Sequence, residues 1–289
     1  MMREDFCAFI LTHGRPDRVH TYTTLRKAGY TGKIYIVIDD EDKTESEYSK
    51  RFGNEVLQFS KAEIAKTFDE GDNFDDRRAI IYARNACWDL AKKVGCRYFI
   101  QLDDDYTHFN VRFKLDGSPC NGMIHQMMDD VLCSMLDFYI SIPALSIAMS
   151  QGGDFIGGAT PDKRKLTRKA MNTFICSTDR PFQFFGRVNE DVNTYTTTGR
   201  KGGLFFTVMQ AFMNQEITQK GQGGMTEMYI DSGTYIKSFY SVMYCPSGVK
   251  VGQMGDSRSP HYRLHHQINW NRVAPKILRE THRKASAHG

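Results

Sequence analysis

The sequence predicts an α/β protein built on a mostly parallel sheet. Short apolar runs of strand length alternate with helix-like patterns through the first hundred residues. Three of these runs are followed directly by polar or acidic residues, and glycine or proline breakers separate the segments. Strands that alternate with helices form parallel sheets, whose ligands bind beyond the carboxyl ends of the strands.

The individual elements follow from these patterns. Phe6–Leu11 is a continuous apolar run that stops before the Gly14-Arg15-Pro16 breaker, and Asp17 is placed to cap a helix that reaches about Ala28. In the helix predicted at 77–94, apolar residues recur at helical spacing. The remaining elements predicted in this part are strands at 34–38, 56–59 and 98–102, a helix at 45–52 and a loop at 69–76.

The rest of the chain has a looser pattern. It predicts a helix at 126–139, strands at 144–149, 182–185, 204–208 and 239–244, and loops at 201–203 and 220–224. Residues 151–158 form a glycine-rich turn whose spacing matches neither phosphate-binding nor dinucleotide-binding loops, so we expect a hairpin or an acceptor-side loop. No repeat or linker divides the chain, and we expect one domain over residues 1–289.

Composition excludes several classes of protein. With 40% apolar and 25% charged residues, the 289-residue chain is typical of a globular protein. The longest apolar stretch, Phe138–Met149, contains Pro143 and is too short to span a bilayer. Only a six-residue apolar run follows the charged start of the chain, so no secretory signal is visible and we expect cytoplasmic residence. Seven scattered cysteines, none at Cys-x-x-Cys spacing, predict reduced thiols rather than disulfides or a zinc site.

The net charge of +4 is unevenly distributed. Residues 1–110 carry 17 basic and 20 acidic side chains, whereas the remainder carries 21 basic and 14 acidic ones. The basic side chains gather in 163–169 and in 258–284. Such clusters suit a polyanionic partner such as nucleic acid, although a solvated basic face or tail is the alternative.

The most chemically informative segment is Asp103-Asp104-Asp105, which ends the apolar run Tyr98–Leu102. Three adjacent carboxylates repel one another unless a cation lies between them. Oxygen ligands of this kind suit Mg²⁺ or Mn²⁺, which hold one or two protein carboxylates and complete their shell with water and phosphate oxygens. The sequence therefore predicts a metal-bridged diphosphate here, with a solvated acidic turn as the alternative.

The Asp triplet resembles the Asp-x-Asp motif of GT-A nucleotide-sugar glycosyltransferases, Thr12–Pro16 resembles their first nucleotide-contacting strand end, and Ala83-Arg84-Asn85 is similar to an element before their metal motif. The run from Gly71-Asp-Asn-Phe to Tyr106, with the glycine-rich turn at 151–158, more narrowly resembles phage DNA-base glycosyltransferases. That group is associated with pyrimidine-hydroxylating dioxygenases and related to the enzyme that glucosylates hydroxymethyluracil to make base J.

The resemblance implies roles for particular residues in a donor half, residues 1–110. Asp105 would contact the metal, and Asp103 would reach the ribose or a metal-bound water, with Asp104 completing the donor motif. A late histidine often adds a metal or diphosphate contact in this fold, and His261 is the first candidate, with His265 and His266 as others or as surface residues. The remaining donor contacts implied are Thr12 and Arg15 to the nucleotide, Asp39 to the uridine, and Arg84 to the diphosphate or sugar, with a surface ion pair as the alternative for Arg84.

An acceptor half, residues 111–289, is implied by the same resemblance. Glu190-Asp191 resembles the acidic pair that inverting enzymes place beside the acceptor, so Asp191, with Glu190 second, would remove the acceptor proton. The alternative is a helix N-terminus, where acids are favoured by the dipole, and a dispensable Asp191 would favour a retaining mechanism. Basic residues 163–169 and the rings of Phe174, Phe182, Phe184 and Phe185 would hold DNA and stack an extruded base, unless the phenylalanines are core.

We therefore expect a metal-dependent enzyme, using Mn²⁺ or Mg²⁺, that moves a hexose or pentose from a UDP-sugar onto a 5-hydroxymethyl pyrimidine in phage DNA, in the host cytoplasm. The competing hypotheses are a transferase that acts on a surface polysaccharide or another glycan, and a nonenzymatic nucleic-acid-binding module with a degenerate transferase fold.

Overall fold

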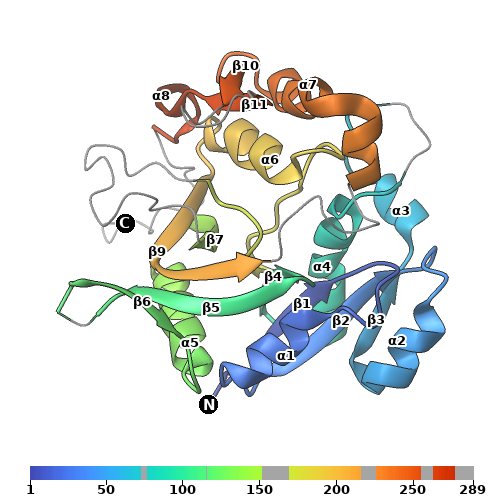
Figure 1. Cartoon of the computed structure of the whole chain (residues 1–289), viewed down its shortest axis with the longest axis vertical. Helices are drawn as coiled ribbons and strands as arrows, with labels where there is room; N and C mark the ends of the chain where they lie inside the picture. The colour runs from blue at the N-terminus through green and yellow to red at the C-terminus, as the bar shows by residue number, and fades with distance from the viewer. Residues whose placement is uncertain (73–76, 115, 152–168, 216–225, 255–262, 277–289) are drawn as a thin grey trace, which may run out of the picture.

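The computed structural model describes residues 1–72, 77–114, 116–151, 169–215, 226–254 and 263–276 (Figure 1). The helices are α1 (His20–Lys27), α2 (Glu45–Phe52), α3 (Lys61–Ala65), α4 (Ile81–Lys93), α5 (Met128–Ser141), α6 (Glu190–Gly199), α7 (Thr226–Tyr244) and α8 (Trp270–Val273), with a 3₁₀ turn η1 (Gly53–Glu55). The strands are β1 (Phe6–Leu11), β2 (Lys33–Asp39), β3 (Val56–Phe59), β4 (Tyr98–Asp103), β5 (Tyr106–Phe113), β6 (Pro119–Met123), β7 (Ala144–Gln151), β8 (Phe174–Ser177), β9 (Leu204–Gln215), β10 (Val249–Met254) and β11 (Arg263–Ile268).

Within the described residues, nine strands form one sheet in the order β3-β2-β1-β4-β8-β7-β9-β5-β6. The four strands of the first hundred residues are parallel to one another, as predicted. Beyond β4 the sheet is mixed, because β8 runs antiparallel to β4 and β7, β7 and β9 are parallel, and β5 is antiparallel to β9 and β6. The α/β class is confirmed, and one sheet runs through both halves of the chain.

Strand β1 shows why the first strands have continuous apolar sequences. Phe6, Ala8 and Ile10 pack into a core cluster with residues of α1 and α5, whereas Cys7 and Phe9 pack on the other face with residues of α4. Successive side chains of a strand point to opposite faces, so a strand covered by helices on both sides needs apolar residues at every position. The sheet is therefore the middle of three layers.

The register of the parallel strands brings their polar ends together. Leu11, the last residue of β1, lies opposite Asp103 of β4 and Val37 of β2. Thr12, Asp39 and the Asp triplet therefore meet at one edge of the sheet, as the strand-end argument predicts.

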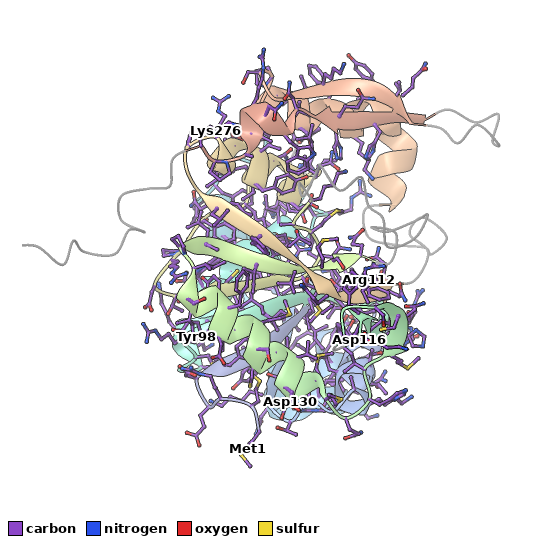
Figure 2. The ribbon with its side chains drawn as sticks, turned by 90° about the vertical axis from the view of Figure 1, so that its left-hand side faces the viewer. Met1, Tyr98, Arg112, Asp116, Asp130 and Lys276 are labelled. Carbon is purple, nitrogen blue, oxygen red and sulfur yellow. The ribbon has the colours of Figure 1, made fainter. Side chains whose placement is uncertain are left out.

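The C-terminal elements gather at one end of the molecule. In both views α7, the β10–β11 hairpin and α8 lie together, and α6 lies between them and the sheet (Figures 1 and 2). Contacts of α6 with α7 and α8 connect this end to the edge where the acidic residues meet. No helix among the described residues is long and apolar enough to span a membrane.

The strand predicted at 182–185 is wrong, because this segment joins no sheet. The backbone N–H and carbonyl groups of Phe184 form hydrogen bonds with a side chain instead. The Phe184 N–H donates to Asn85 Oδ1 at 2.9 Å, and Asn85 Nδ2 donates to the Phe184 carbonyl at 3.2 Å. An amide side chain on α4 thus takes the place of a neighbouring strand.

The strand predicted at 239–244 is also wrong, since this aromatic run is the end of helix α7. Tyr240 and Tyr244, four residues apart and so on one helix face, donate hydrogen bonds to Asp72 and to the Asp69 carbonyl. Tertiary contact therefore overrides the strand preference of the aromatic residues. Strands β5, β6, β8, β10 and β11 were not expected, and the turn at 152–158 and the loop at 220–224 lie outside the described residues.

Candidate active site

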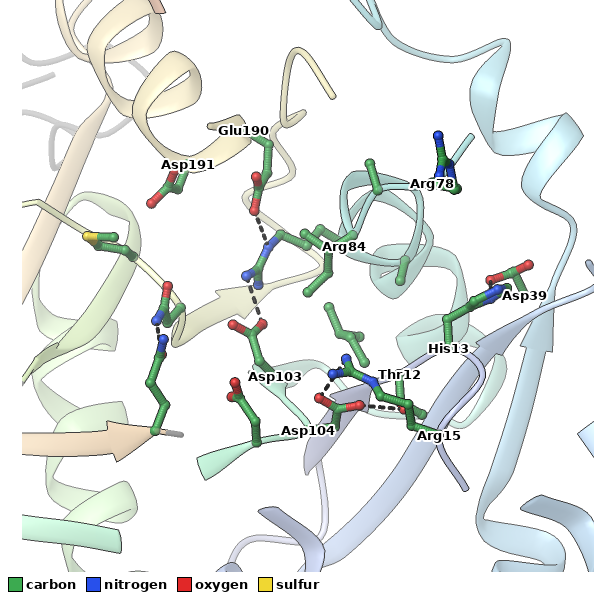
Figure 3. Close-up of a pocket in the computed structure, with 18 of the residues that line it drawn as sticks. Thr12, His13, Arg15, Asp39, Arg78, Arg84, Asp103, Asp104, Glu190 and Asp191 are labelled. Carbon is green, nitrogen blue, oxygen red and sulfur yellow. Dashed lines mark hydrogen bonds and ion pairs between the residues drawn. The ribbon is translucent and has the colours of Figure 1, made fainter. Parts of the chain in front are cut away.

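A cavity of about 520 Å³ opens at the edge of the sheet where the strand ends meet (Figure 3). This is an ordinary size for a small-molecule site. It brings together all of the predicted donor and catalytic residues that precede His261. The lining contains Thr12, Arg15, Asp39, Arg84, Asp103, Asp104, Asp105, Glu190 and Asp191, together with His13, Lys61, Arg78, Met171, Asn172, Asn189, Gln215 and Lys237.

Helix α1 fixes the backbone of the Asp triplet. The Thr21 hydroxyl donates to the Asp103 carbonyl at 2.6 Å and accepts from the Tyr106 N–H at 2.9 Å. The Thr21 N–H also donates to the Asp104 carbonyl. These bonds hold the tight turn between β4 and β5, so the three carboxylates leave the sheet at defined positions.

Arg84 connects two acidic parts of the cavity. Its Nη2 donates to Asp103 Oδ1 and its Nε donates to Glu190 Oε1, both at 2.9 Å (Figure 3). The side chain is only 2% exposed. Burial opposes its charge, but Asp103 and Glu190 outweigh this and raise the pKa of Arg84. Arg84 is therefore a buried cation between carboxylates that lie far apart in sequence.

Asp104 differs from its neighbours because both of its oxygens are occupied. Thr12 Oγ1 donates to one of them at 2.6 Å and Arg15 Nη2 to the other at 3.0 Å. The Thr12 hydroxyl also lies 3.0 Å from the Tyr48 hydroxyl. Asp104 therefore holds the loop after β1 against the Asp triplet.

Asp105 has an open carboxylate. Its Oδ1 is buried and has no hydrogen-bond partner among the described residues. Burial, together with the charges of Asp103 and Asp104, raises the pKa of Asp105 to about 7, and burial raises that of Asp103 to about 6 despite Arg84. Repulsion and an unfilled oxygen are the features that a divalent cation would relieve.

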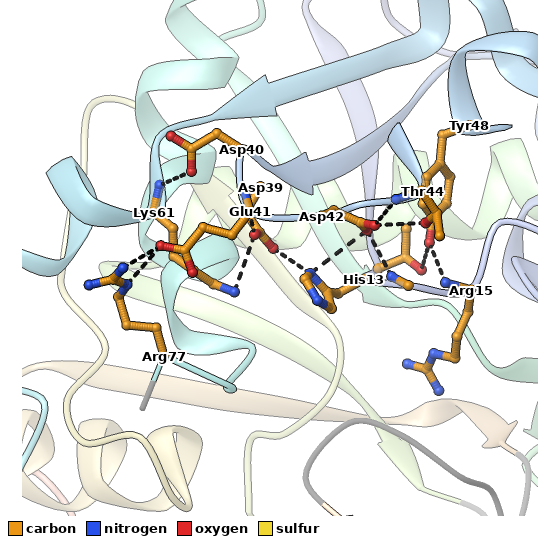
Figure 4. Close-up of polar contacts among 12 residues, drawn as sticks. His13, Arg15, Asp39, Asp40, Glu41, Asp42, Thr44, Tyr48, Lys61 and Arg77 are labelled. Atoms are coloured by element: carbon orange, nitrogen blue, oxygen red, sulfur yellow. Dashed lines mark hydrogen bonds and ion pairs between the residues drawn. The ribbon is translucent and has the colours of Figure 1, made fainter. Parts of the chain in front are cut away.

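The opposite end of the cavity holds a second charged cluster, around Asp39 (Figure 4). Asp39 lies 2.7 Å from His13 Nδ1 and 3.2 Å from Lys61 Nζ. Burial opposes ionisation of Asp39, but the His13 hydrogen bond and the Lys61 charge hold its pKa below the usual range. The same hydrogen bond raises the pKa of His13. This end of the cavity presents a carboxylate between a histidine and a lysine.

Glu190 and Asp191 lie in the first turn of α6. This is the position expected if the two acids only stabilise a helix N-terminus. Both nevertheless line the cavity. Asn189, in the left-handed conformation at φ 56°, precedes them, and its Nδ2 donates to the Lys237 carbonyl at 2.5 Å and to Ser241 Oγ at 3.3 Å. Asparagine is one of the few residues that adopt this conformation readily. The two carboxylates are thus positioned from α7 as well as from α6.

The two acids differ in their surroundings. Glu190 is paired with Arg84, whereas Asp191 has no ion pair among the described residues and accepts a hydrogen bond from the Val192 N–H at 2.7 Å. Burial, followed by the charge of Glu190, raises the pKa of Asp191 to about 7. A carboxylate with such a pKa can exchange protons near neutral pH.

Two of the three late histidines are among the described residues. His265 and His266 lie on β11, with their Nε2 atoms 3.3 and 2.9 Å from Lys169 Nζ, and neither belongs to the cavity lining. Burial and the Lys169 charge lower the pKa of His266 to about 2, so it is neutral. His261 lies outside the described residues, as do residues 163–168.

Two of the four phenylalanines expected to stack a base belong to the core, and the other two pack on neighbouring rings. Phe174 and Phe184 are buried and pack on each other and under the Arg84 guanidinium. Phe182 packs edge-on against Trp88 at 4.9 Å between ring centroids. Phe185 stacks on Tyr244. None of these rings lines the cavity, and Phe174 and Phe184 take the core positions of the alternative interpretation.

Several lining residues were missed by the sequence reasoning. His13 directly follows Thr12, and Lys61 follows the end of β3, so the strand-end rule itself pointed to both. Asn172, Asn189, Gln215 and Lys237 come from segments that the pattern did not order in space. No sequence signal identified them.

Comparisons with known proteins place the chain. The model of the TET-associated glycosyltransferases (TAGT) matches residues 6–224. Among solved structures, glucosyl-3-phosphoglycerate synthase from Mycobacterium tuberculosis, crystallised with Mn²⁺, UDP and phosphoglyceric acid, is 12% identical over 92% of this chain and 87% of its own, with a TM-score of 0.46. TarS 1–349 from S. aureus is 10% identical over 72% of this chain and 60% of its own, with a TM-score of 0.42. A search of the curated proteins finds no match.

The family match extends over most of the chain and includes every lining residue of the cavity except Lys237. The chain therefore belongs to the TET-associated glycosyltransferase family.

Proposed function

We propose that this enzyme transfers a sugar from a UDP-sugar onto the hydroxymethyl group of a 5-hydroxymethyl pyrimidine in DNA, as a step of phage DNA modification. The observation that carries the proposal is the cavity itself, which joins an Asp triplet with an open carboxylate to a separate carboxylate of raised pKa. The family's association with pyrimidine-hydroxylating enzymes supports a hydroxylated base as acceptor.

The donor would lie along the strand ends. Asp39, held between His13 and Lys61, would face the uracil, and the loop that contains Thr12 and Arg15 would follow the ribose and diphosphate. Asp105, with Asp103, would hold Mn²⁺ or Mg²⁺. The ion would neutralise the charge that develops on the leaving diphosphate.

The donor set fits such an ion. Asp105 Oδ1 lacks a partner and Asp103 commits one oxygen to Arg84, which leaves oxygen ligands for a hard cation. The described residues contain no group of three metal-binding side chains. A Mg²⁺-like site needs only one or two carboxylates, because water and phosphate oxygens complete the shell.

Asp191 would act as the base on the acceptor. A hydroxymethyl group is a poor nucleophile until its proton is removed, and Asp191 can accept that proton as the oxygen attacks the sugar. Glu190 is less suited, because Arg84 binds its carboxylate. One attack on the face opposite the diphosphate would make the enzyme inverting.

The Asp191 assignment predicts a pH profile. Protonated Asp191 cannot accept a proton, so kcat/KM should fall about tenfold per pH unit below a pH near 7. Asp191→Asn should lower kcat about 10²- to 10⁴-fold and remove this slope. Steady-state kinetics between pH 5.5 and 9 test the assignment, and a variant that retains full activity would favour a retaining mechanism.

The same carboxylate should cost stability at high pH. Its folded-state pKa lies above the unfolded value near 4, so the folded state binds the proton more tightly and loses stability as pH rises from about 4 to 7. Asp191→Asn carries no charge there. We expect its Tm to exceed that of the wild type by a few °C at pH 8, with a smaller difference at pH 5.

The substrate itself is tested directly. Purified enzyme with Mn²⁺ and a panel of UDP-sugars would be incubated with duplex DNA that contains 5-hydroxymethyluracil, 5-hydroxymethylcytosine or unmodified bases. The masses of the nucleosides would then be measured by mass spectrometry. The proposal expects a mass gain of one sugar on a hydroxylated base only. UDP release without a DNA product would move the acceptor to a glycan or small molecule, and neither UDP release nor product would favour a binding module.

A further inference from the structure

We infer that the amide pair of Asn172 and Gln215 reads the hydrogen-bonding edge of the acceptor pyrimidine. The inference rests on the proposed function and names two specificity residues within it. Both side chains line the cavity beside the Asp triplet and Asp191. Asn172 Nδ2 donates to Gln215 Oε1 at 2.5 Å, so the two amides act as one unit.

The pair is held in place by the residue that follows Asp105. Tyr106 lies opposite Gln215 in the β5–β9 register, and its buried hydroxyl donates to the Asn172 carbonyl at 2.8 Å. Asn172 adopts the left-handed conformation, with φ at 62°. A conformation that few residues adopt, fixed by a buried tyrosine, places the pair at a set distance from the Asp triplet.

The pair offers a donor and an acceptor to the cavity. Both side chains are half-buried. Asn172 Oδ1 and the Gln215 amide N–H groups have no hydrogen-bond partner among the described residues. If the oxygen and nitrogen atoms of both amides are exchanged, the pair still presents one free acceptor oxygen and free N–H donors.

A donor beside an acceptor matches a pyrimidine. Uracil presents N3–H next to a carbonyl oxygen, and cytosine presents its amino group next to N3, so either base can form two bonds with the pair. The two bases present these groups in opposite order, which allows the pair to discriminate between them. The Asp39 cluster would hold the donor's own base, so the amide pair would serve the acceptor.

Two variants test the inference. Gln215→Glu keeps the bond from Asn172 but removes the free donor, and Asn172→Gly removes the amide while glycine keeps the left-handed backbone. Each should lower kcat/KM for the modified DNA about 10- to 100-fold, through a higher KM for DNA, and change the ratio between hydroxymethyluracil and hydroxymethylcytosine.

A matched control is Gln58→Glu, on an exposed position of β3, which should change none of these values. Unchanged KM and base preference in both variants would overturn the inference. So would an altered KM for the UDP-sugar or altered sugar choice, because the pair would then contact the donor sugar. Failure of the wild type to modify any DNA is a different result, which removes the proposed function and this inference with it.

Discussion

Asp105→Asn is expected to abolish sugar transfer, with a loss of kcat/KM of at least about 10³-fold, because metal stabilisation of a leaving group contributes several kcal/mol. Asp105 is the residue of the triplet with a buried oxygen that lacks a hydrogen-bond partner among the described residues. The fold should persist. Removing one of three repelling carboxylates should raise the Tm of the metal-free protein slightly.

Thermal denaturation with and without Mn²⁺ tests, independently of activity, whether Asp105 binds the metal. Wild-type protein should gain about 2.7 kcal/mol of stability at a Mn²⁺ concentration 100-fold above Kd, and Asp105→Asn should gain almost none. Asp104→Asn is the matched control, because both oxygens of Asp104 already accept hydrogen bonds. Equal stabilisation of wild type and Asp105→Asn by Mn²⁺ would refute the metal assignment.

Arg84→Met should combine a loss of stability with a loss of activity. It leaves Asp103 and Glu190 without their buried counter-charge, and breaking a buried pair costs about 3–5 kcal/mol. We expect the lower end of that range, since both carboxylates keep some contact with solvent. Tm should then fall by several °C and kcat/KM by more than about 100-fold, because Asp103 and Glu190 lose their fixed separation.

Urea denaturation and kinetics check this expectation, and a second variant isolates its cause. Arg84→Met combined with Glu190→Gln should recover part of the lost stability, because the second change removes an unpaired charge. Arg97→Met, which breaks an exposed pair with Asp179, should leave both measurements near wild type. A double variant as unstable as Arg84→Met alone would attribute the loss to packing against Phe174 and Phe184.

The sequence correctly predicted that the polar strand ends meet, because parallel strands impose a simple rule. Their carboxyl ends meet at one edge, so Thr12, Asp39 and the Asp triplet could be placed together from the order of the elements alone. The roles of individual atoms were less accessible. Asp103, Asp104 and Asp105 are the same residue type, but their surroundings differ. Asp103 pairs with Arg84, Asp104 binds the loop after β1, and Asp105 has an oxygen without a partner among the described residues.

The structure after residue 110 was predicted less well because it depends on long-range pairing. Tyr106 meets Gln215 only through the β5–β9 register, and the Phe184 backbone is satisfied by Asn85 rather than by a strand. The aromatic run at 239–244 has a composition typical of a strand, but it is helical. Its tyrosines contact Asp69 and Asp72 from one face of that helix. Local patterns carry no information about such partners.

The Arg84 bridge has a consequence for protein engineering. The resemblance implies a donor half before residue 110 and an acceptor half after it, but one sheet runs through both, so the two halves cannot be exchanged independently. A chimera joined at that point must supply a carboxylate for Arg84 and an amide opposite Tyr106, or the grafted acceptor part will meet a buried charge without its partner. New acceptor specificities should therefore be sought by changing side chains around the amide pair rather than by exchanging halves.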